Sequence, residues 1–338
     1  MTLRIAINGF GRIGRNVLRA LHESGRDDIK VVAINDLSTT ENLAHLLRYD
    51  SVHGRFSGQV SFTENSLDIG NGKIQVTAER NLEDQNWADN DVDIVMECTG
   101  IFTARDAAAK HLKAGAKRVL ISAPGANADK TVVFGVNEGA IGKDDLVVSN
   151  GSCTTNALAP VAKVLHDQFG IESGFMTTVH AYTGDQPTLD RVHRKDPNRG
   201  RAAAMSMIPT STGAAKAIGL VLPELKGKLD GKAIRVPTPN VSVVDLTVNL
   251  KSAASKDSIN AAMHEAANGP LKNILQVIDD SVVSIDLNHD PHSSSLVTRD
   301  TVVVTDKFAR VLSWYDNEWG FSNRMLDTAM VMSQFISR

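Results

Sequence analysis

The sequence predicts an α/β protein of two domains: an N-terminal domain with a parallel sheet, then an α+β domain with a mixed or largely antiparallel sheet. Before Ser149, short apolar strands alternate with helical segments, and a glycine-rich turn follows the first strand. After Ser149, longer segments with alternating β-branched residues take over. A chain of 338 residues is long enough for two such domains.

The N-terminal domain begins with a predicted strand, Leu3–Ile7, and continues to a second β-branched strand, Lys30–Asn35. A helix is expected between them over Asn16–His22, because its apolar residues recur at helical spacing. Further elements of this domain are two strands, Asp91–Met96 and Arg118–Ser122, and an alanine-rich helix, Ala104–Ala114. This alternation implies a parallel sheet built from right-handed βαβ units.

The second domain is expected to open with a helix over Asn156–Phe169 and a strand over Phe175–Ala181. Between Tyr182 and Ala204 the chain is rich in Arg, Asp, Pro and Gly with little periodicity, and loops of that length are usually functional or disordered. Alternating patterns then predict strands within Ala233–Leu250, Val282–Leu287 and Val302–Trp314, and a closing helix covers Asn323–Phe335.

The predicted domain boundary lies at the polar junction Asn150–Cys153. We therefore expect a first domain of residues 1–152, completed by the C-terminal segment 318–338, and a second domain of residues 153–317.

Composition narrows the possible functions. With 36 basic and 39 acidic residues the formal net charge is -3, which argues against an electrostatic binder of nucleic acid or membranes. Two cysteines, Cys98 and Cys153, argue against a disulfide-stapled secreted fold. No apolar run is long enough to span a bilayer, and the N-terminus has no secretion signature, so a cytoplasmic location is expected. No metal site is expected.

A dinucleotide-binding motif follows the first strand. Gly9, Gly11 and Gly14 form G-x-G-x-x-G between a strand and a helix, where the glycines allow a tight turn, backbone approach to a pyrophosphate, and close packing. The second strand ends near Asp36, 22 positions after Gly14, where a carboxylate can bond the ribose hydroxyls of NAD and repel the 2′-phosphate of NADP. A turn residue capping the strand is the alternative interpretation of Asp36.

Cys153 stands in a polar run, Ser149–Asn156, directly before an apolar helix. Ser152 is a plausible N-cap, which places the thiol at the helix N-terminus, where the helix dipole favours a thiolate. Most buried cysteines are inert packing residues, and Cys98 at the end of an apolar strand fits that description better.

His180 is the histidine most suited to act as a base. It ends an apolar strand and leads into the arginine-rich loop, as a site residue on a rigid element should. Sequence position alone does not pair it with Cys153.

Six long segments, in order along the whole chain, resemble phosphorylating glyceraldehyde-3-phosphate dehydrogenases. They are INGFGRIGR at Ile7–Arg15, SCTTN at Ser152–Asn156, TTVHAYTGDQ at Thr177–Gln186, PTSTGAAKA at Pro209–Ala217, RVPTPNVSVVDL at Arg235–Leu246 and SWYDNEWGFSNR at Ser313–Arg324. Several matches in family order are far more specific than any single motif.

The resemblance implies a glycolytic, NAD-dependent enzyme and a homotetramer. Cys153 would be the nucleophile that forms a hemithioacetal and then a thioester, His180 its general base, and inorganic phosphate the group that releases the acyl phosphate. The implied cofactor contacts are Gly9, Phe10, Gly11, Arg12, Ile13, Gly14, Asp36, Arg80, Ser122 and Asn317. The implied phosphate contacts are Thr183 and Arg235 for the substrate, and Ser152, Thr154, Arg199, Thr212 and Gly213 for the attacking phosphate.

Four positions depart from patterns frequent in the family: Ala157, Asp185, Val192 and Phe321. Val192 weakens the argument against NADP, although Asp36 is the stronger signal. For Arg199 and its basic neighbours Arg191, Arg194, Lys195 and Arg201, a solvated charged loop is the alternative to a phosphate site.

Three other functions compete with this interpretation. Erythrose-4-phosphate dehydrogenase shares the nucleophile and the histidine but releases a free acid, and the intact segment Ser211–Lys216 favours phosphorolysis. Aspartate-semialdehyde dehydrogenase generally favours NADP and lacks the context of His180. A non-catalytic NAD-binding interaction protein would not need Cys153, His180 and Arg235 together.

Overall fold

The computed structural model describes residues 2–194 and 196–336. Met1, Ser337 and Arg338, which the predicted domains include, and Lys195 of the basic loop lie outside the described residues. The chain forms two compact units, the first from residues 1–132, 138–151 and 322–338 and the second from residues 133–137 and 152–321. Within the described residues, no helix is both long and apolar enough to cross a membrane.

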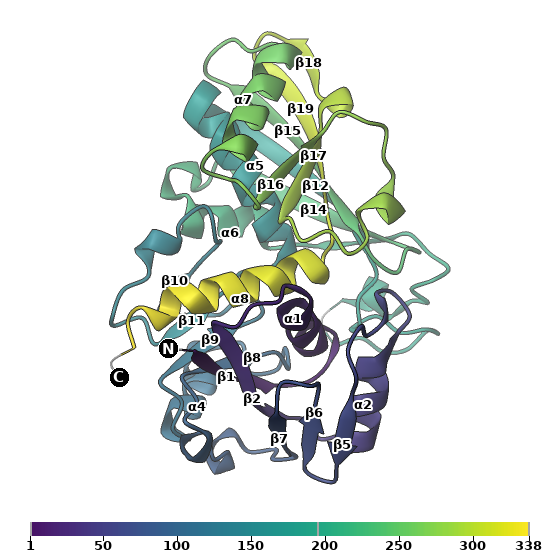
Figure 1. The fold of residues 1–338 in the computed structure, drawn as a ribbon. Coiled ribbons are helices and arrows are strands. Elements are labelled where there is room, and N and C mark those ends of the chain that lie inside the picture. Colours follow the sequence, from purple (N-terminus) through teal and green to yellow (C-terminus); the bar gives the residue numbers. More distant parts are fainter. Residues whose placement is uncertain (1, 195, 337–338) are drawn as a thin grey trace. The chain divides into compact units, whose positions relative to one another are not determined.

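A nine-stranded sheet forms the centre of the first unit (Figure 1), with strand order β10-β11-β9-β8-β1-β2-β7-β6-β5. Pairing is parallel from β10 to β7 and antiparallel between β7, β6 and β5. Its strands are β1 (Leu3–Asn8), β2 (Ile29–Asn35), β5 (Ser61–Thr63), β6 (Ser66–Asp68), β7 (Lys73–Thr77), β8 (Ile94–Glu97), β9 (Arg118–Ile121), β10 (Lys130–Thr131) and β11 (Val147–Ser149). The predicted parallel sheet is confirmed, whereas β5, β6, β7, β10 and β11 are strands that the sequence pattern did not predict.

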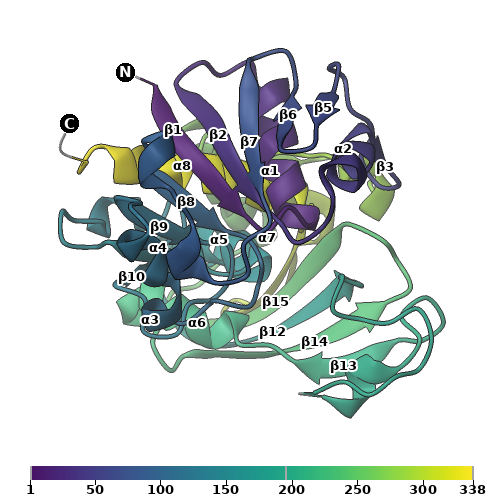
Figure 2. The same ribbon diagram turned by 90° about the horizontal axis from the view of Figure 1, so that it is seen from below.

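Helices cover both faces of this sheet (Figures 1 and 2), as the burial of both faces of its central strands requires. They are α1 (Arg12–Glu23), α2 (Thr40–Arg48), α3 (Arg105–Ala108), α4 (Lys110–Lys113) and α8 (Trp319–Ser333), with a small hairpin of β3 (Tyr49–Asp50) and β4 (Gly54–Arg55). The single helix predicted over Ala104–Ala114 is wrong in detail, since Ala109 separates two four-residue helices. The first helix begins four residues earlier than predicted, directly after Gly11.

The second unit is built on an eight-stranded sheet, with order β13-β14-β12-β15-β19-β17-β16 and β18 paired to β19. Two pairs are parallel, β12 with β14 and β16 with β17, and the others are antiparallel, so the predicted mixed sheet is confirmed. Its strands are β12 (Ile171–Ala181), β13 (Ile208–Ser211), β14 (Leu229–Val236), β15 (Ser242–Leu250), β16 (Leu275–Ile278), β17 (Ser294–Val297), β18 (Val302–Thr305) and β19 (Phe308–Tyr315).

Three helices cover one face of this second sheet and enclose its core (Figure 1). They are α5 (Cys153–Phe169), α6 (Ala214–Val221) and α7 (Lys256–Asn268). Side chains alternate along a strand, and in β12 Met176, Thr178 and His180 are the buried set, whereas Phe175 on the other face is 49% exposed. His180 is therefore the last residue of the face that packs against α5.

The strand predicted within Val282–Leu287 is wrong. Residues Ser284–Leu287 form a 3-10 helix, and the Asp286 carboxylate accepts a hydrogen bond from the Val283 amide at 2.8 Å. The alternation misled because Val283 and Ile285 are 61% and 70% exposed instead of facing a core. The other 3-10 helices are η1 (Leu82–Asp84), η2 (Ala88–Asn90), η3 (Glu138–Ala140), η4 (Pro197–Gly200), η5 (Pro223–Leu225) and η7 (Thr298–Asp300).

Candidate functional site

The first unit carries the glycine-rich turn between β1 and α1. Gly9 has φ +90, and a Cβ there would come within 2.8 Å of the Thr99 backbone nitrogen. A Cβ on Gly14 would overlap the Gly9 carbonyl oxygen, so this glycine allows the helix and the strand to approach. A Cβ on Gly11 would meet nothing within 4 Å, which leaves open space where a ligand could approach the backbone.

A pocket of about 410 Å³ lies at the carboxyl ends of β1, β2 and β8. Gly9, Gly11, Asp36 and Arg80 are among the residues that line it. The Asp36 carboxylate accepts hydrogen bonds from the Phe10 amide at 2.8 Å and the Ser38 amide at 3.0 Å. The loop therefore holds a fixed negative charge beside the glycine turn, as a site for ribose hydroxyls requires.

The remaining predicted cofactor residues have other contacts. Phe10 is 1% exposed, its amide donates to Asp36 at 2.8 Å, and its carbonyl oxygen accepts from Arg15 Nη1 at 2.9 Å. Arg12 forms an ion pair with Asp50, and Ser122 forms a hydrogen bond to the Cys98 thiol. Ile13 is half-buried in the first turn of α1, and Asn317 lies in the second unit, where its amide oxygen accepts a hydrogen bond from Ser242 at 2.8 Å.

A buried carboxylate supports the floor of this pocket. Glu97, 1% exposed, accepts hydrogen bonds from Asn8 Nδ2 at 2.6 Å and from the amide and hydroxyl of Thr99. His111, fully buried, lies with its Nε2 3.0 Å from the same carboxylate, while Trp87 Nε1 donates to its Nδ1 at 3.0 Å. Because Nδ1 accepts, His111 donates from Nε2 as a neutral ring. The pocket residues Asn8 and Thr99 are thus held by one carboxylate.

Glu97→Ala is expected to destabilise the protein by about 3–5 kcal/mol, since it leaves several buried donors without an acceptor. Urea unfolding monitored by circular dichroism would measure this change. Glu83→Ala is the matched control, because Glu83 pairs with Lys113 at the surface and its loss should change little. Equal unfolding midpoints for the two variants would contradict the role assigned to Glu97.

The second unit places Cys153 and His180 together. Ser152 is the N-cap of α5, and its hydroxyl accepts a hydrogen bond from the Thr155 amide at 3.0 Å, so the predicted cap is confirmed. Cys153 is therefore the first residue of α5, and its Sγ lies 3.5 Å from His180 Nε2. A thiol at a helix N-terminus beside an imidazole can form a nucleophilic pair.

The hydrogen bonds of His180 leave Nε2 free to accept a proton from the thiol. Nδ1 lies 2.7 Å from the Ala181 carbonyl oxygen, which can only accept, and 3.2 Å from Arg235 Nη1, which can only donate, and the shorter contact assigns the hydrogen to Nδ1. Arg235 faces His180 directly across the parallel pair β12–β14, and its Nη1 donates to the same carbonyl at 3.0 Å. Register alone thus brings together two residues that are 55 positions apart.

Burial opposes charge on both members of this pair. Desolvation raises the pKa of the Cys153 thiol, and the nearby Arg235 charge opposes that rise. Burial and Arg235 together lower the pKa of His180 to about 3. Desolvation thus opposes the thiolate that the helix dipole favours at Cys153.

Tyr315, which was not among the predicted site residues, supports the pair. Its hydroxyl is 2.8 Å from Thr154 Oγ1 and 2.9 Å from Thr178 Oγ1, and its ring meets the His180 ring edge-on at 5.8 Å. The signal was the alternation in β19, where Tyr315 continues the buried set. Thr154, 5% exposed, is therefore tied to the interior by its hydroxyl.

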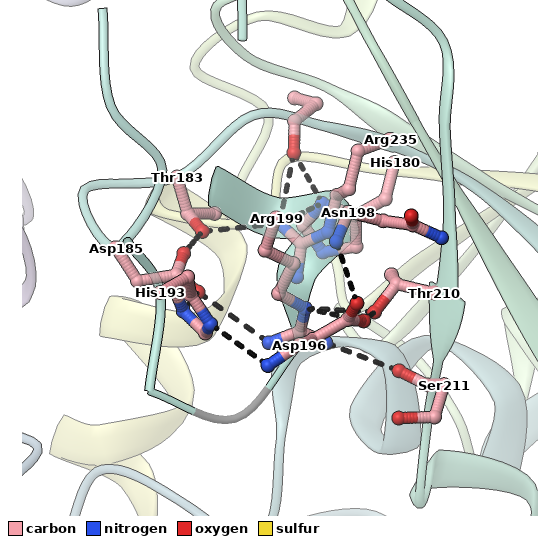
Figure 3. A network of polar contacts seen from close by, with 11 residues as sticks. His180, Thr183, Asp185, His193, Asp196, Asn198, Arg199, Thr210, Ser211 and Arg235 are labelled. Carbon is pink, nitrogen blue, oxygen red and sulfur yellow. Dashed lines mark hydrogen bonds and ion pairs between the residues drawn. The ribbon is translucent and has the colours of Figure 1, made fainter. Parts of the chain in front are cut away.

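The structure connects several of the predicted phosphate residues through one polar network (Figure 3). Arg235 Nη1 donates to Thr183 Oγ1 at 3.0 Å, and Thr183 in turn donates to Asp185. Arg199 Nη1 lies 3.4 Å from Asp185, and its Nε donates to Thr210 at 2.8 Å. Arg199 also donates from Nη2 to the Ser211 carbonyl at 3.1 Å, at the end of β13.

Thr212 and Gly213 follow β13 directly and lead into α6. The Thr212 hydroxyl accepts a hydrogen bond from the Ala214 amide at 3.1 Å, and Gly213 is the N-cap residue of the helix. Amides at a helix start suit anion binding. In the part of the chain that the structure describes, no group of three or more His, Cys, Asp or Glu side chains is arranged to hold a metal ion.

Both halves of the chain match parts of one enzyme family. Residues 3–105 match "Glyceraldehyde 3-phosphate dehydrogenase, NAD binding domain", and residues 152–317 match "Glyceraldehyde 3-phosphate dehydrogenase, C-terminal domain".

The chain is also similar to curated proteins over almost its whole length. A glyceraldehyde-3-phosphate dehydrogenase of Xanthobacter flavus is 64% identical over 334 residues, 99% of each chain. One from Cereibacter sphaeroides is 62% identical over 336 residues, 99% of this chain and 100% of the relative. One from Geobacillus stearothermophilus is 56% identical over 330 residues, 97% of this chain and 98% of the relative.

Proposed function

Because the chain belongs to the glyceraldehyde 3-phosphate dehydrogenase family of NAD-dependent oxidoreductases, we propose that it converts D-glyceraldehyde 3-phosphate and inorganic phosphate to 1,3-bisphosphoglycerate. Cys153 is the nucleophile and His180 the base in this proposal. The observation that carries it is the 3.5 Å approach of Cys153 Sγ, at the start of α5, to Nε2 of His180.

The proposed reaction begins with transfer of the thiol proton to His180 Nε2 as sulfur attacks the aldehyde carbon. The resulting hemithioacetal oxyanion is stabilised by the Cys153 amide at the helix N-terminus and by the protonated His180 ring. The oxyanion then collapses to a carbonyl as hydride leaves the same carbon, while His180 keeps the proton that it took from the thiol. A thioester on Cys153 remains, and phosphate attack releases the acyl phosphate and the thiolate.

NAD supplies the hydride acceptor when it is bound. The residues of the first unit fit such a cofactor, because the open backbone at Gly11 and the carboxylate of Asp36 border the same pocket. We propose that Gly9, Gly11 and Gly14 form the pyrophosphate turn and that Asp36 binds the ribose hydroxyls. Phe10, Arg12, Ile13, Arg80, Ser122 and Asn317 complete the proposed set of contacts.

Arg235 and Thr183 form the proposed site for the substrate phosphate. The Arg235 Nε–H is buried and has no acceptor among the described residues, although Nη1 is fully engaged. A buried guanidinium donor without an acceptor favours an anionic ligand at this place. Ser152, Thr154, Arg199, Thr212 and Gly213 are proposed for the attacking phosphate.

The proposed function is tested by following NADH formation from glyceraldehyde 3-phosphate and from erythrose 4-phosphate, each with and without inorganic phosphate. Phosphate-dependent turnover of the three-carbon substrate is expected. Phosphate-independent turnover of the four-carbon sugar would identify the erythrose enzyme instead, and no turnover of either would favour a non-catalytic NAD-binding protein.

Asp36→Asn is expected to lower the preference for NAD over NADP by about tenfold, because it removes a negative charge from the proposed ribose site at little cost in shape. The measurement is kcat/KM with each cofactor. Asp27→Asn is the matched control, an exposed acid at the opposite end of β2. An unchanged cofactor ratio in Asp36→Asn would contradict the assignment.

We also propose a homotetramer in the cytoplasm. Exposed apolar side chains support assembly, since Val192 and Met205 of the second unit are 94% and 79% exposed. Sedimentation velocity of the purified chain measures the assembly, and a monomer at micromolar concentration would contradict it.

A further inference from the structure

We propose that Asp185 is an internal anion that competes with phosphate at both proposed phosphate sites and thereby sets their affinity. This inference rests on the proposed function, because it assigns Thr183 and Arg199 to those sites. Asp185 occupies the turn after β12, between Thr183 and the basic loop (Figure 3).

The first step concerns Thr183. A hydroxyl has one hydrogen to donate, and a phosphate oxygen needs a donor. The Thr183 hydroxyl gives that hydrogen to Asp185 Oδ1, while its oxygen accepts from Arg235 Nη1 at 3.0 Å. Thr183 can therefore donate to a bound phosphate only after its hydrogen turns away from Asp185.

The second step concerns Arg199. Its Nη1 lies 3.4 Å from Asp185 Oδ2, and its Nε and Nη2 already donate to Thr210 and to the Ser211 carbonyl. An incoming anion would therefore compete with Asp185 for the Nη1 edge of the Arg199 guanidinium. The two oxygens of one carboxylate hold one residue from each proposed phosphate site.

The charged groups around Asp185 and its exposure indicate that its carboxylate competes with anions and contributes little to holding the fold together. Arg199, Arg235 and His193 supply the neighbouring positive or titratable groups, with His193 Nε2 at 3.7 Å, and Asp196 is the other carboxylate near Arg199, at 3.9 Å. The Asp185 side chain is 41% exposed, so its ion pairs are solvated and contribute little to folding stability. Solvent and small anions can reach it and replace it.

Removing the charge should therefore tighten anion binding. In Asp185→Asn, we expect the Kd for inorganic phosphate to fall about two- to fivefold, the range typical of losing one partly exposed ion pair, since the asparagine oxygen can still accept from Thr183. Isothermal titration with inorganic phosphate, without substrate or cofactor, measures this directly. The KM values for phosphate and for the aldehyde should fall together.

Asp190→Asn is the matched control. Asp190 lies in the same loop and pairs with Arg201 at 2.7 Å, so the variant removes the same charge away from Thr183 and Arg199. Its phosphate Kd should equal that of the wild type. An equal fall of the phosphate Kd in both variants would mean that only the net charge matters, and it would overturn the proposal. An unchanged or higher phosphate Kd in Asp185→Asn would overturn it as well.

A second variant separates the two sites. Within a Thr183→Val background, Asp185→Asn should no longer lower the aldehyde KM, while it should still tighten the binding of inorganic phosphate. If Asp185→Asn lowered the aldehyde KM as much in that background as in the wild type, Asp185 would not act through Thr183, and the proposal would fail. An unchanged unfolding midpoint confirms that each variant is folded.

Wild-type enzyme without phosphate-dependent turnover would refute the proposed function, whereas normal wild-type turnover with no effect of Asp185→Asn refutes only this inference.

Discussion

Cys153→Ser is expected to lower kcat/KM by at least about 10³-fold, because an alcohol oxygen in the same place is a far weaker nucleophile than sulfur. Cofactor binding should persist, since the proposed NAD residues other than Asn317 lie in the first unit. NADH formation and titration of the variant with NAD measure the two properties separately. A variant that oxidised the aldehyde at the wild-type rate would remove Cys153 from the mechanism.

Alkylation by iodoacetamide gives an independent measurement on the same thiol. Burial raises the pKa of Cys153, so its reaction rate should keep rising with pH beyond about 8.5, the ordinary value for a thiol. Burial raises the pKa of Cys98 to about 12, so Cys98 should react more slowly near neutral pH. Loss of the faster-reacting thiol in Cys153→Ser, with retention of that thiol in Cys98→Ser, is the expected pattern.

Local features of the sequence predicted the parts of the site that local geometry determines. The glycine turn and the Ser152 cap each depend on residues within a few positions, and the structure has both where they were expected. The family resemblance supplied the partner of Cys153, because nothing in the spacing of Cys153 and His180 requires them to meet.

Sheet register and burial determine what the sequence could not show. Arg235 faces His180 only because β14 pairs with β12 in one register, and a shift of one residue would turn Arg235 to the other face. Glu97, His111 and Trp87 come from three separate segments, so their network depends on the assembled first unit. The desolvation that opposes a thiolate at Cys153 likewise depends on the whole surrounding core.

His180→Asn is expected to lower kcat/KM by about 10²- to 10⁴-fold, the usual contribution of a positioned general base. Asparagine can still donate a hydrogen bond but cannot take the thiol proton, so the remaining activity should rise more steeply with pH than that of the wild type. His264→Asn in α7 removes a surface histidine beside Asp279 and should retain normal turnover. Activity within tenfold of the wild type would exclude His180 as the base.

Stability gives His180→Asn a second test that does not depend on catalysis. The pKa of His180 is about 3 in the folded chain, against about 6.5 for an exposed histidine. Between about pH 3 and pH 6.5, His180 therefore binds a proton in the unfolded chain but not in the folded chain. The wild type should therefore lose stability through this residue as pH falls below about 6.5. Asparagine carries no such penalty, so from pH 8 to pH 5 the variant should gain about 2 kcal/mol relative to the wild type. Urea unfolding at pH 8 and pH 5 measures the difference in unfolding free energy between the variant and the wild type. If that difference did not change with pH, burial would not hold His180 neutral. The reason why its Nε2 is ready to accept the thiol proton would then be lost.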